Sequence, residues 1–171
     1  KNRSLAITAD VEIPQGGADG VVIAQGGRVG GWSLYFKDGK PTYQYNYLGM
    51  KRFTVASTEV VPAGKATVRF DFAYDGGGLG KGGLGTIFVD GRKVGEGRID
   101  VTQPMIFSAD ETADVGVDDA MPVTEDYEKG DNEFTGRIHK VKIDVGPIGT
   151  SEKVAAAQAQ EQLAMQKAIA D

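Results

Sequence analysis

The sequence has no cysteine, one histidine and no long apolar run. Without cysteine the chain offers no disulfide, no thiolate zinc site and no cysteine nucleophile, and cysteine usage does not indicate its redox compartment. The single histidine, His139, excludes three-histidine zinc sites and serine–histidine triads in their usual forms unless another chain contributes. No apolar run approaches the ~20 residues of a membrane-spanning helix and no signal peptide is evident, so we expect no membrane span.

Glycine, in contrast, is abundant. Its 25 residues among 171 suit many tight turns between short strands better than long helices. A chain of this length is one domain of ordinary size, and its net charge of −5 argues against a nucleic-acid partner. Because the chain begins Lys1-Asn2-Arg3 and enters a strand almost at once, we expect a piece of a longer protein or a processed form.

Two hairpin patterns indicate the fold class. Residues 30–47 form two alternating runs joined by Asp38-Gly39, a pair that can adopt the positive φ angles of a tight primed turn. The same pattern recurs at 87–94 around Asp90-Gly91. Both predict antiparallel β structure.

Other alternating runs complete the predicted sandwich. We expect further strands at 4–13, 21–25, 53–57, 67–74, 99–101 and 112–117, and a last one within 134–145. In that last run the apolar alternation changes parity, which predicts a β-bulge around His139-Lys140. The fold class is therefore all-β, a two-sheet antiparallel sandwich or jelly roll over 1–147.

The final residues, 148–171, predict a helix or tail. The stretch 150–170 is free of glycine and proline, Thr150 or Ser151 can cap it, and Glu152 suits its positive end. Its few apolar side chains define no clean stripe, so we expect the helix to dock loosely, serve a partner or fray.

A glycine-rich stretch, 76–85, contains Gly78, Gly80 and Gly83 in the G-x-G-x-x-G spacing of dinucleotide sites. A strand follows it, whereas a phosphate site needs the N-terminus of a helix. We therefore predict a flexible loop between strands that binds no nucleotide.

An acidic segment spans 110–133, with ten carboxylates against one lysine. Loop carboxylates can bind calcium, which takes about 6–8 oxygen ligands, although no EF-hand spacing is present. The candidate metal ligands are Asp114, Asp118, Asp126 and Asp131. The alternatives are a solvated acidic rim, a face for a basic partner that includes Asp110 and Glu111, or a catalytic carboxylate pair.

Three tyrosines, Tyr43, Tyr45 and Tyr47, share one side of a strand whose other side is neutral and polar. Two interpretations follow. The rings form a stacking platform for sugars, beside amides that bond hydroxyl groups, or they line the core with Trp32 and Phe36.

Six segments, read in order, resemble one known family. They are GGWSLYFKDGKPTYQYNYLG, PAGKATVRFDFAYDGGGLGKGG, IFVDGRKVGEGRI, FSADETADVGVD, PVTEDY and FTGRIHKVKID. Together they resemble the C-terminal region of bacterial arylsulfatases of the alkaline-phosphatase-like sulfatase family, from about Ser4 to Val145. The hairpins are also similar to laminin-G and concanavalin-A-like jelly rolls.

The sulfatase resemblance implies a parent that hydrolyses sulfate esters with a formylglycine made from Cys or Ser in a C/S-x-P-x-R motif. The residues two positions before the prolines of this chain are Glu12, Gly39, Val60, Thr102, Ala120 and Val145. None is Cys or Ser, so no catalytic residue of the family is carried over to this chain.

The favoured hypothesis is a non-catalytic accessory domain of an arylsulfatase-like sulfuric ester hydrolase. Its partner would be the catalytic domain, which it contacts through loops at 76–85 and 110–131. The alternative is a carbohydrate-binding module of the laminin-G or lectin type that binds a glycan, in one version with calcium. The resemblance implies a periplasmic or secreted location.

Overall fold

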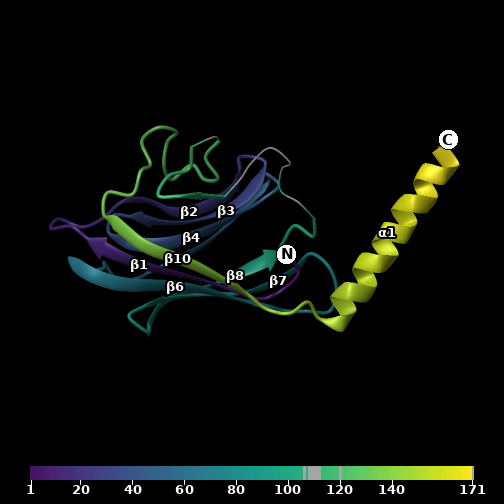
Figure 1. Cartoon of the computed structure of the whole chain (residues 1–171), viewed down its shortest axis with the longest axis horizontal. Coiled ribbons are helices and arrows are strands. Elements are labelled where there is room, and N and C mark those ends of the chain that lie inside the picture. The colour runs from purple at the N-terminus through teal and green to yellow at the C-terminus, as the bar shows by residue number, and fades with distance from the viewer. Residues whose placement is uncertain (106, 108–112, 120, 171) are drawn as a thin grey trace.

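The computed structural model describes residues 1–105, 107, 113–119 and 121–170, which form two packed antiparallel sheets followed by a helix (Figure 1). Sheet A contains, in spatial order, β10 (Arg137–Val145), β1 (Leu5–Ile13), β6 (Gly64–Tyr74), β7 (Lys81–Val89) and β8 (Arg92–Val101). Sheet B contains β5 (Lys51–Ala56), β4 (Lys40–Tyr47), β3 (Gly30–Lys37), β2 (Gly20–Gly27) and β9 (Ala113–Val115). The predicted all-β sandwich is confirmed.

The two predicted hairpins join β3 to β4 and β7 to β8. Asp38 and Gly39 have φ angles of 52° and 71°, and Asp90 and Gly91 have 50° and 79°. Positive φ at both central residues defines a type I′ turn, whose twist matches that of the flanking strands. The turn residues therefore set the register of each hairpin.

The predicted bulge is also present, in β10. Asp10 of β1 pairs with Lys140, whereas the next residue, Val11, pairs with Ile138. His139 is thus the extra residue, as the change of parity in the sequence predicted.

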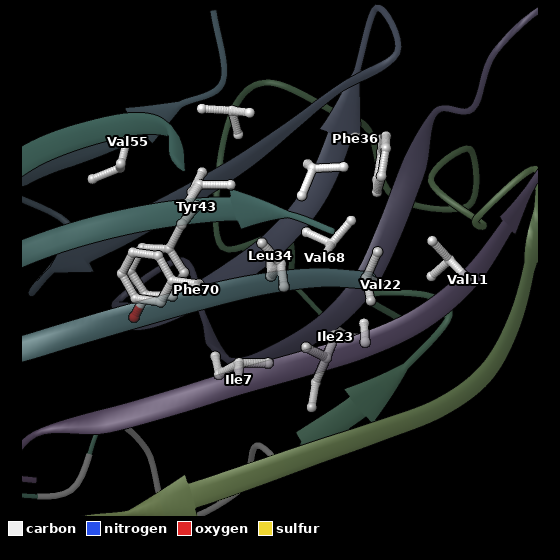
Figure 2. Close-up of a cluster of buried hydrophobic side chains, with 14 of the residues drawn as sticks. Ile7, Val11, Val22, Ile23, Leu34, Phe36, Tyr43, Val55, Val68 and Phe70 are labelled. Carbon is white, nitrogen blue, oxygen red and sulfur yellow. The ribbon is translucent and has the colours of Figure 1, made fainter. Parts of the chain in front are cut away.

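The core lies between the sheets. Ile7, Val68 and Phe70 of sheet A face Leu34 and Tyr43 of sheet B, all at most 2% exposed (Figure 2). Phe70 and Tyr43 stack with their ring centroids 3.6 Å apart and their planes 9° apart. Each such buried side chain stabilises the fold by about 1.5–3 kcal/mol.

The prediction of a loop over 76–85 is wrong in its second half, because β7 begins at Lys81. A Cβ on Gly83 would lie 2.4 Å from the carbonyl oxygen of Ala73 and 2.5 Å from the ring of Phe72. A Cβ on Gly85 would lie 2.9 Å from the ring of Phe70. These glycines therefore leave room for core rings within a strand.

Helix α1 (Thr150–Ala170) projects away from the sandwich (Figure 1). Its first turn is attached, since the Gly78 amide donates to Glu152 Oε1 at 3.1 Å. Farther along, Val154, Leu163 and Met165 are each about half exposed. Within the described residues, no helix has both the length and the apolar character to cross a membrane.

Candidate functional site

An apolar cleft of ≈ 280 Å³ opens between the sheets at the end of the sandwich where the chain begins. The N-terminal segment borders it, as do Thr102, Gln103 and Phe107. Both sheets supply its walls, through Leu5 of β1, Phe72 of β6, Ile99 of β8, Gln25 of β2, Trp32 of β3 and Tyr43 and Tyr45 of β4. The cleft is therefore continuous with the hydrophobic core.

Aromatic rings dominate the sheet B wall. The rings of Trp32 and Tyr43 stack with centroids 6.1 Å apart and planes 21° apart. Tyr45 meets Phe107 edge to face at 5.7 Å. Offset and edge contacts of this kind fix ring orientation, so the wall is rigid.

Most polar groups of this wall are bonded within the chain. Trp32 Nε1 donates to Gln25 Oε1 at 3.0 Å, and the Tyr45 hydroxyl accepts a hydrogen bond from the Gln103 amide at 2.7 Å. Burial raises the pKa of Tyr45 to about 12, so its hydroxyl stays neutral at physiological pH. The wall is therefore uncharged.

The two charged residues that line the cleft are both cations. Lys1 places Nζ 2.6 Å from the ring centroid of Phe107, and burial lowers the pKa of its ammonium group to about 7. Arg3 is half-buried and donates from Nη1 to the Gly146 carbonyl at 3.4 Å. Among the described lining residues there is no Asp, Glu or His.

Asn2 ties the segment that carries these cations to two neighbouring loops. Its Nδ2 donates to the Pro104 carbonyl at 2.9 Å, and its Oδ1 accepts from the Gly80 amide at 2.8 Å. The positions of Lys1 and Arg3 at the cleft therefore depend on loops about 80 to 100 residues away in the chain.

The lip of the cleft is apolar and exposed. Ile143 and Val145 of β10 pair with Ile7 and Leu5 of β1, so their side chains share the inward face of sheet A. They are nevertheless 42% and 54% exposed. The opposing edge strand, β9, pairs only with residues 23–25 of β2 and does not cover them.

The tyrosine strand supports the second of its two interpretations. Tyr43 and Tyr45 are 2% and 6% exposed, so they line the core and the cleft wall and form no open platform on the surface. Tyr47 is half-buried against the core. The sequence thus placed the three tyrosines on one side of β4 and offered core lining as one of two interpretations, whereas it gave no sign of the cleft.

The acidic segment has a different place in the structure. Residues 116–119 and 121–135 cover the outer face of sheet B, where Val123 and Tyr127 pack on Val21 and Tyr35 (Figure 1). The carboxylate of Asp118, 2% exposed, accepts from the Val123 amide at 2.9 Å and from the Tyr127 hydroxyl at 2.6 Å. Desolvation raises the pKa of Asp118, against the effect of these hydrogen bonds.

Asp126 accepts hydrogen bonds from the Tyr35 hydroxyl and from Lys37 Nζ. Although partial burial acts in the opposite direction, these two donors hold the pKa of Asp126 below its usual value. Asp118 and Asp126 are therefore both engaged by groups of the chain itself.

The predicted metal ligands do not form a cluster. Asp114 lies on β9, paired with Ala24, and Asp131 lies exposed in a turn opposite Glu128. Nowhere in the described part of the chain do three or more His, Asp or Glu side chains converge as a metal site would require. Calcium stays a prediction, and Asp110 and Glu111 lie outside the described residues.

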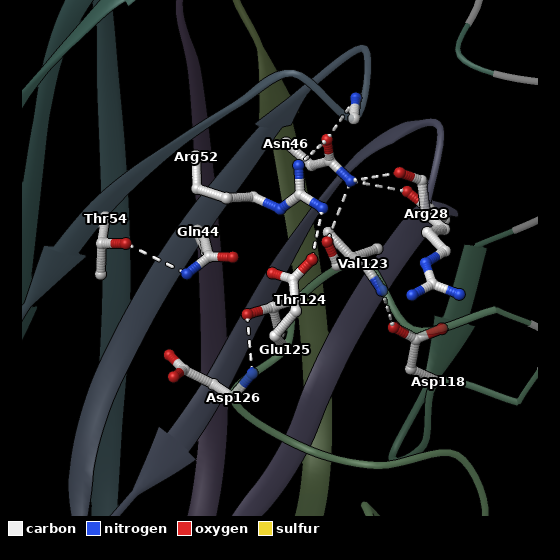
Figure 3. A network of polar contacts seen from close by, with 12 residues as sticks. Arg28, Gln44, Asn46, Arg52, Thr54, Asp118, Val123, Thr124, Glu125 and Asp126 are labelled. Carbon is white, nitrogen blue, oxygen red and sulfur yellow. Dashed lines mark hydrogen bonds and ion pairs between the residues drawn. The ribbon is translucent and has the colours of Figure 1, made fainter.

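Asn46 is the centre of this covered face (Figure 3). Its Nδ2 lies 3.0 Å from the carbonyl oxygens of Gly27, Arg28 and Val123. Its Oδ1 accepts from the Gly49 amide at 2.8 Å and from Arg52 Nη1 at 2.7 Å, while Arg52 Nη2 pairs with Glu125 Oε1. One amide thus joins three loops to β4 and β5.

Several cleft residues had no signal in the sequence. Lys1, Arg3, Gln25, Gln103 and Phe107 belong to three separate segments and follow no motif spacing. His139, the single histidine, is exposed, and its Nε2 lies 3.2 Å from Glu12 Oε2 outside the cleft.

No known protein family matches the sequence, and no curated protein matches it either. Solved structures do match in fold. Domains LG4-5 of the mouse laminin α1 chain superimpose with a TM-score of 0.56 at 12% identity, over 85% of this chain and 37% of that one. The LG1-3 region of the laminin α2 chain gives 0.57 at 14% identity, over 84% of this chain and 28% of that one.

A bacterial module matches over more of its own length. The CBM40 of the Ruminococcus gnavus IT-sialidase, solved with α2,3-sialyllactose bound, gives a TM-score of 0.55 at 15% identity, over 85% of this chain and 79% of the module. Identities this low show the fold alone. The fold is a laminin-G-like jelly roll, and none of these matches is a sulfatase.

Proposed function

We propose that this chain is a non-catalytic carbohydrate-binding module whose ligand site is the cleft between the sheets. The proposal rests on one observation, a cleft of ≈ 280 Å³ walled by Trp32, Tyr45 and Phe107 in a jelly-roll fold. Typical ligand clefts measure roughly 300–1,000 Å³, so this one has the size for a single sugar ring. The fold likeness to the sialyllactose-bound module supports the same class of ligand.

The chemistry of the walls favours binding over turnover. A pyranose presents axial C–H groups on its faces, which pack against aromatic rings, while its hydroxyls need a few polar groups at the rim. Asn2, Gln25 and Thr102 supply polar atoms at this cleft. Glycoside hydrolysis needs two carboxyl groups, and none belongs to the described residues of the lining.

Phe107→Ala tests the site. Phe107 is half-buried at the cleft, so its truncation removes contact area for the ligand at a small cost in stability. We expect at least a tenfold loss of affinity for glycans selected on an array, measured by calorimetry on the full chain. Phe134→Ala is the matched control, since Phe134 is half-buried against Phe36 outside the cleft.

Two results would overturn the proposal. One is an array without binding to any neutral, sialylated, uronic or sulfated glycan. The other is a glycan whose affinity is the same for Phe107→Ala and the unaltered chain, because the sugar would then bind elsewhere.

A second candidate is the accessory role beside a sulfatase catalytic domain. The six sequence segments between residues 30 and 144 that resemble arylsulfatases support it. No family model and no curated protein matches the chain, so these comparisons give no further support for a sulfatase. A formylglycine motif in the coding sequence upstream of Lys1 would select this candidate, and such a protein would be secreted or periplasmic. A binding module and an accessory domain are compatible, since the cleft could hold a glycan beside an active site.

A further inference from the structure

The charged residues that line the cleft are all positive, although the net charge of the chain is −5. Lys1 and Arg3 are cationic, and no carboxylate belongs to the described lining. Neither cation forms an ion pair with any described residue.

Of the 17 other lysines and arginines, eight form ion pairs between described residues. Ion pairs join Lys37 to Asp126, Lys51 to Asp100, Arg52 to Glu125, Arg92 to Glu59 and Arg98 to Asp75. Most of these pairs are exposed, where water already solvates the charges. Arg3 is half-buried, so it has less water around it, and neither cleft cation has a counter-charge among the described residues. An unpaired cation that is partly removed from water is the more costly arrangement.

The immediate surroundings of Lys1 and Arg3 supply only weak compensation. The face of Phe107 attracts the Lys1 ammonium through its quadrupole, by about 0.5–2 kcal/mol for such contacts. Arg3 Nη1 donates a hydrogen bond of 3.4 Å to the Gly146 carbonyl. The buried Nε of Arg3 has no hydrogen-bond partner among the described residues. Donors therefore remain available to an acceptor that carries negative charge.

We infer that the cleft selects a ring that bears an anionic group, a carboxylate or a sulfate. The ring lies against Trp32, Tyr45 and Phe107, and the anion faces Lys1 and Arg3. The inference rests on the proposed function in taking the cleft as the ligand site. It also agrees with the lowered pKa of Lys1, because a bound anion restores the charge that burial disfavours.

Such a ring has two possible sources, an acidic sugar unit or a free aromatic anion. Three probes with one common nitrophenyl group separate them: 4-nitrophenyl glucuronide, 4-nitrophenyl glucoside and 4-nitrophenyl sulfate. Calorimetry on the full chain at pH 6 and low salt measures each affinity. We expect the glucuronide to bind at least tenfold more tightly than the glucoside.

Charge-removing variants assign the selection to the two cations. Lys1→Gln with Arg3→Gln should reduce the affinity for the glucuronide at least tenfold and leave that for the glucoside within about twofold, since only the charged contact is lost. Arg137→Gln, an exposed position on β10 outside this cleft, is the control and should change neither.

The outcomes separate the inference from the proposed function. Equal binding of glucuronide and glucoside overturns the anion selection and leaves the carbohydrate module intact. Binding of the sulfate without either sugar supports the anion selection and overturns the carbohydrate module. Binding of none of the three, or a glucuronide affinity unchanged by the double substitution, overturns the anion selection.

Discussion

The covered outer face of sheet B and the cleft between the sheets use charge in opposite ways. On the outer face Asp118, Asp126 and Glu125 each have a donor from the chain itself, namely Tyr127, Lys37 and Arg52. In the cleft, Lys1 and Arg3 have no acidic partner among the described residues. The acidic segment therefore stabilises the fold, whereas we propose the cleft as the place where an outside ligand supplies the missing counter-charge.

This contrast separates two kinds of polar residue that look alike in a sequence. A buried carboxylate with all its donors in place cannot be exchanged without loss, because the donors would be left without partners. A cation that lacks a partner contributes little to stability and much to recognition. Substitutions on the outer face of sheet B should therefore change the stability of the fold, whereas substitutions of the cleft cations should change ligand binding.

The largest effect is expected from Asn46→Ala. The substitution removes five hydrogen bonds of a fully buried amide and leaves three carbonyls, those of Gly27, Arg28 and Val123, without this donor. We expect the free energy of unfolding to fall by about 3–4 kcal/mol. Urea denaturation measures it, and a loss below about 1 kcal/mol would contradict the central role of Asn46.

Asp118→Ala should follow, with a loss of about 2–3 kcal/mol. The Val123 amide and the Tyr127 hydroxyl lose their acceptor in a buried setting. Asp119→Ala is the matched control, because Asp119 is the exposed neighbour and should change stability by less than about 0.5 kcal/mol. Equal losses for both variants would show that the acidic segment acts by charge alone.

Lys1→Gln belongs to the other side of the comparison. Since Lys1 forms no ion pair with a described residue, we expect a change in unfolding free energy within about 0.5 kcal/mol, beside the loss of anion affinity proposed above. A loss comparable with that of Asp118→Ala would make the cleft cation a structural group.

Asp118→Asn should show a small dependence on pH. Burial raises the pKa of Asp118 in the folded chain, so its ionised form costs stability above that pKa, and the cost vanishes below the unfolded value of 3.8. Asparagine does not titrate. The stability of the variant relative to the unaltered chain should therefore rise between pH 4 and pH 7, measured by urea denaturation across that range, and a constant difference would refute the assignment.

The smallest effect is expected from removal of calcium. Asp118 and Asp126 already accept hydrogen bonds from the chain, so we expect the Tm in excess chelator to equal that in millimolar calcium. A rise of several degrees with calcium would restore the predicted metal site in the acidic segment.

Local features of the fold could be predicted because they depend on neighbours in sequence. Positive φ angles at Asp38-Gly39 and Asp90-Gly91 define the hairpins, and a change of parity locates the bulge at His139. The prediction from local pattern was wrong for the second half of the glycine-rich stretch 76–85, which is part of β7 and not a loop. Gly83 and Gly85 lie in β7 because that strand pairs with β6, and they are glycines because the rings of Phe72 and Phe70, which come from β6, need the space.

The sequence alone was enough to predict an antiparallel sandwich and to place Tyr43, Tyr45 and Tyr47 on one side of their strand, but it left open whether that side faces the core or solvent. The alternation of strand residues and the conformation of tight turns depend on neighbours in the sequence, so they can be predicted from one sequence. The packing of the two sheets settles the rest: Tyr43 and Tyr45 face the core, Lys1, Arg3 and Phe107 meet them at a cleft, and Asp118, Glu125 and Asp126 accept from donors of the chain on the opposite face of sheet B. The physical reason is that both sites join segments many residues apart, whose meeting depends on how the two sheets pack.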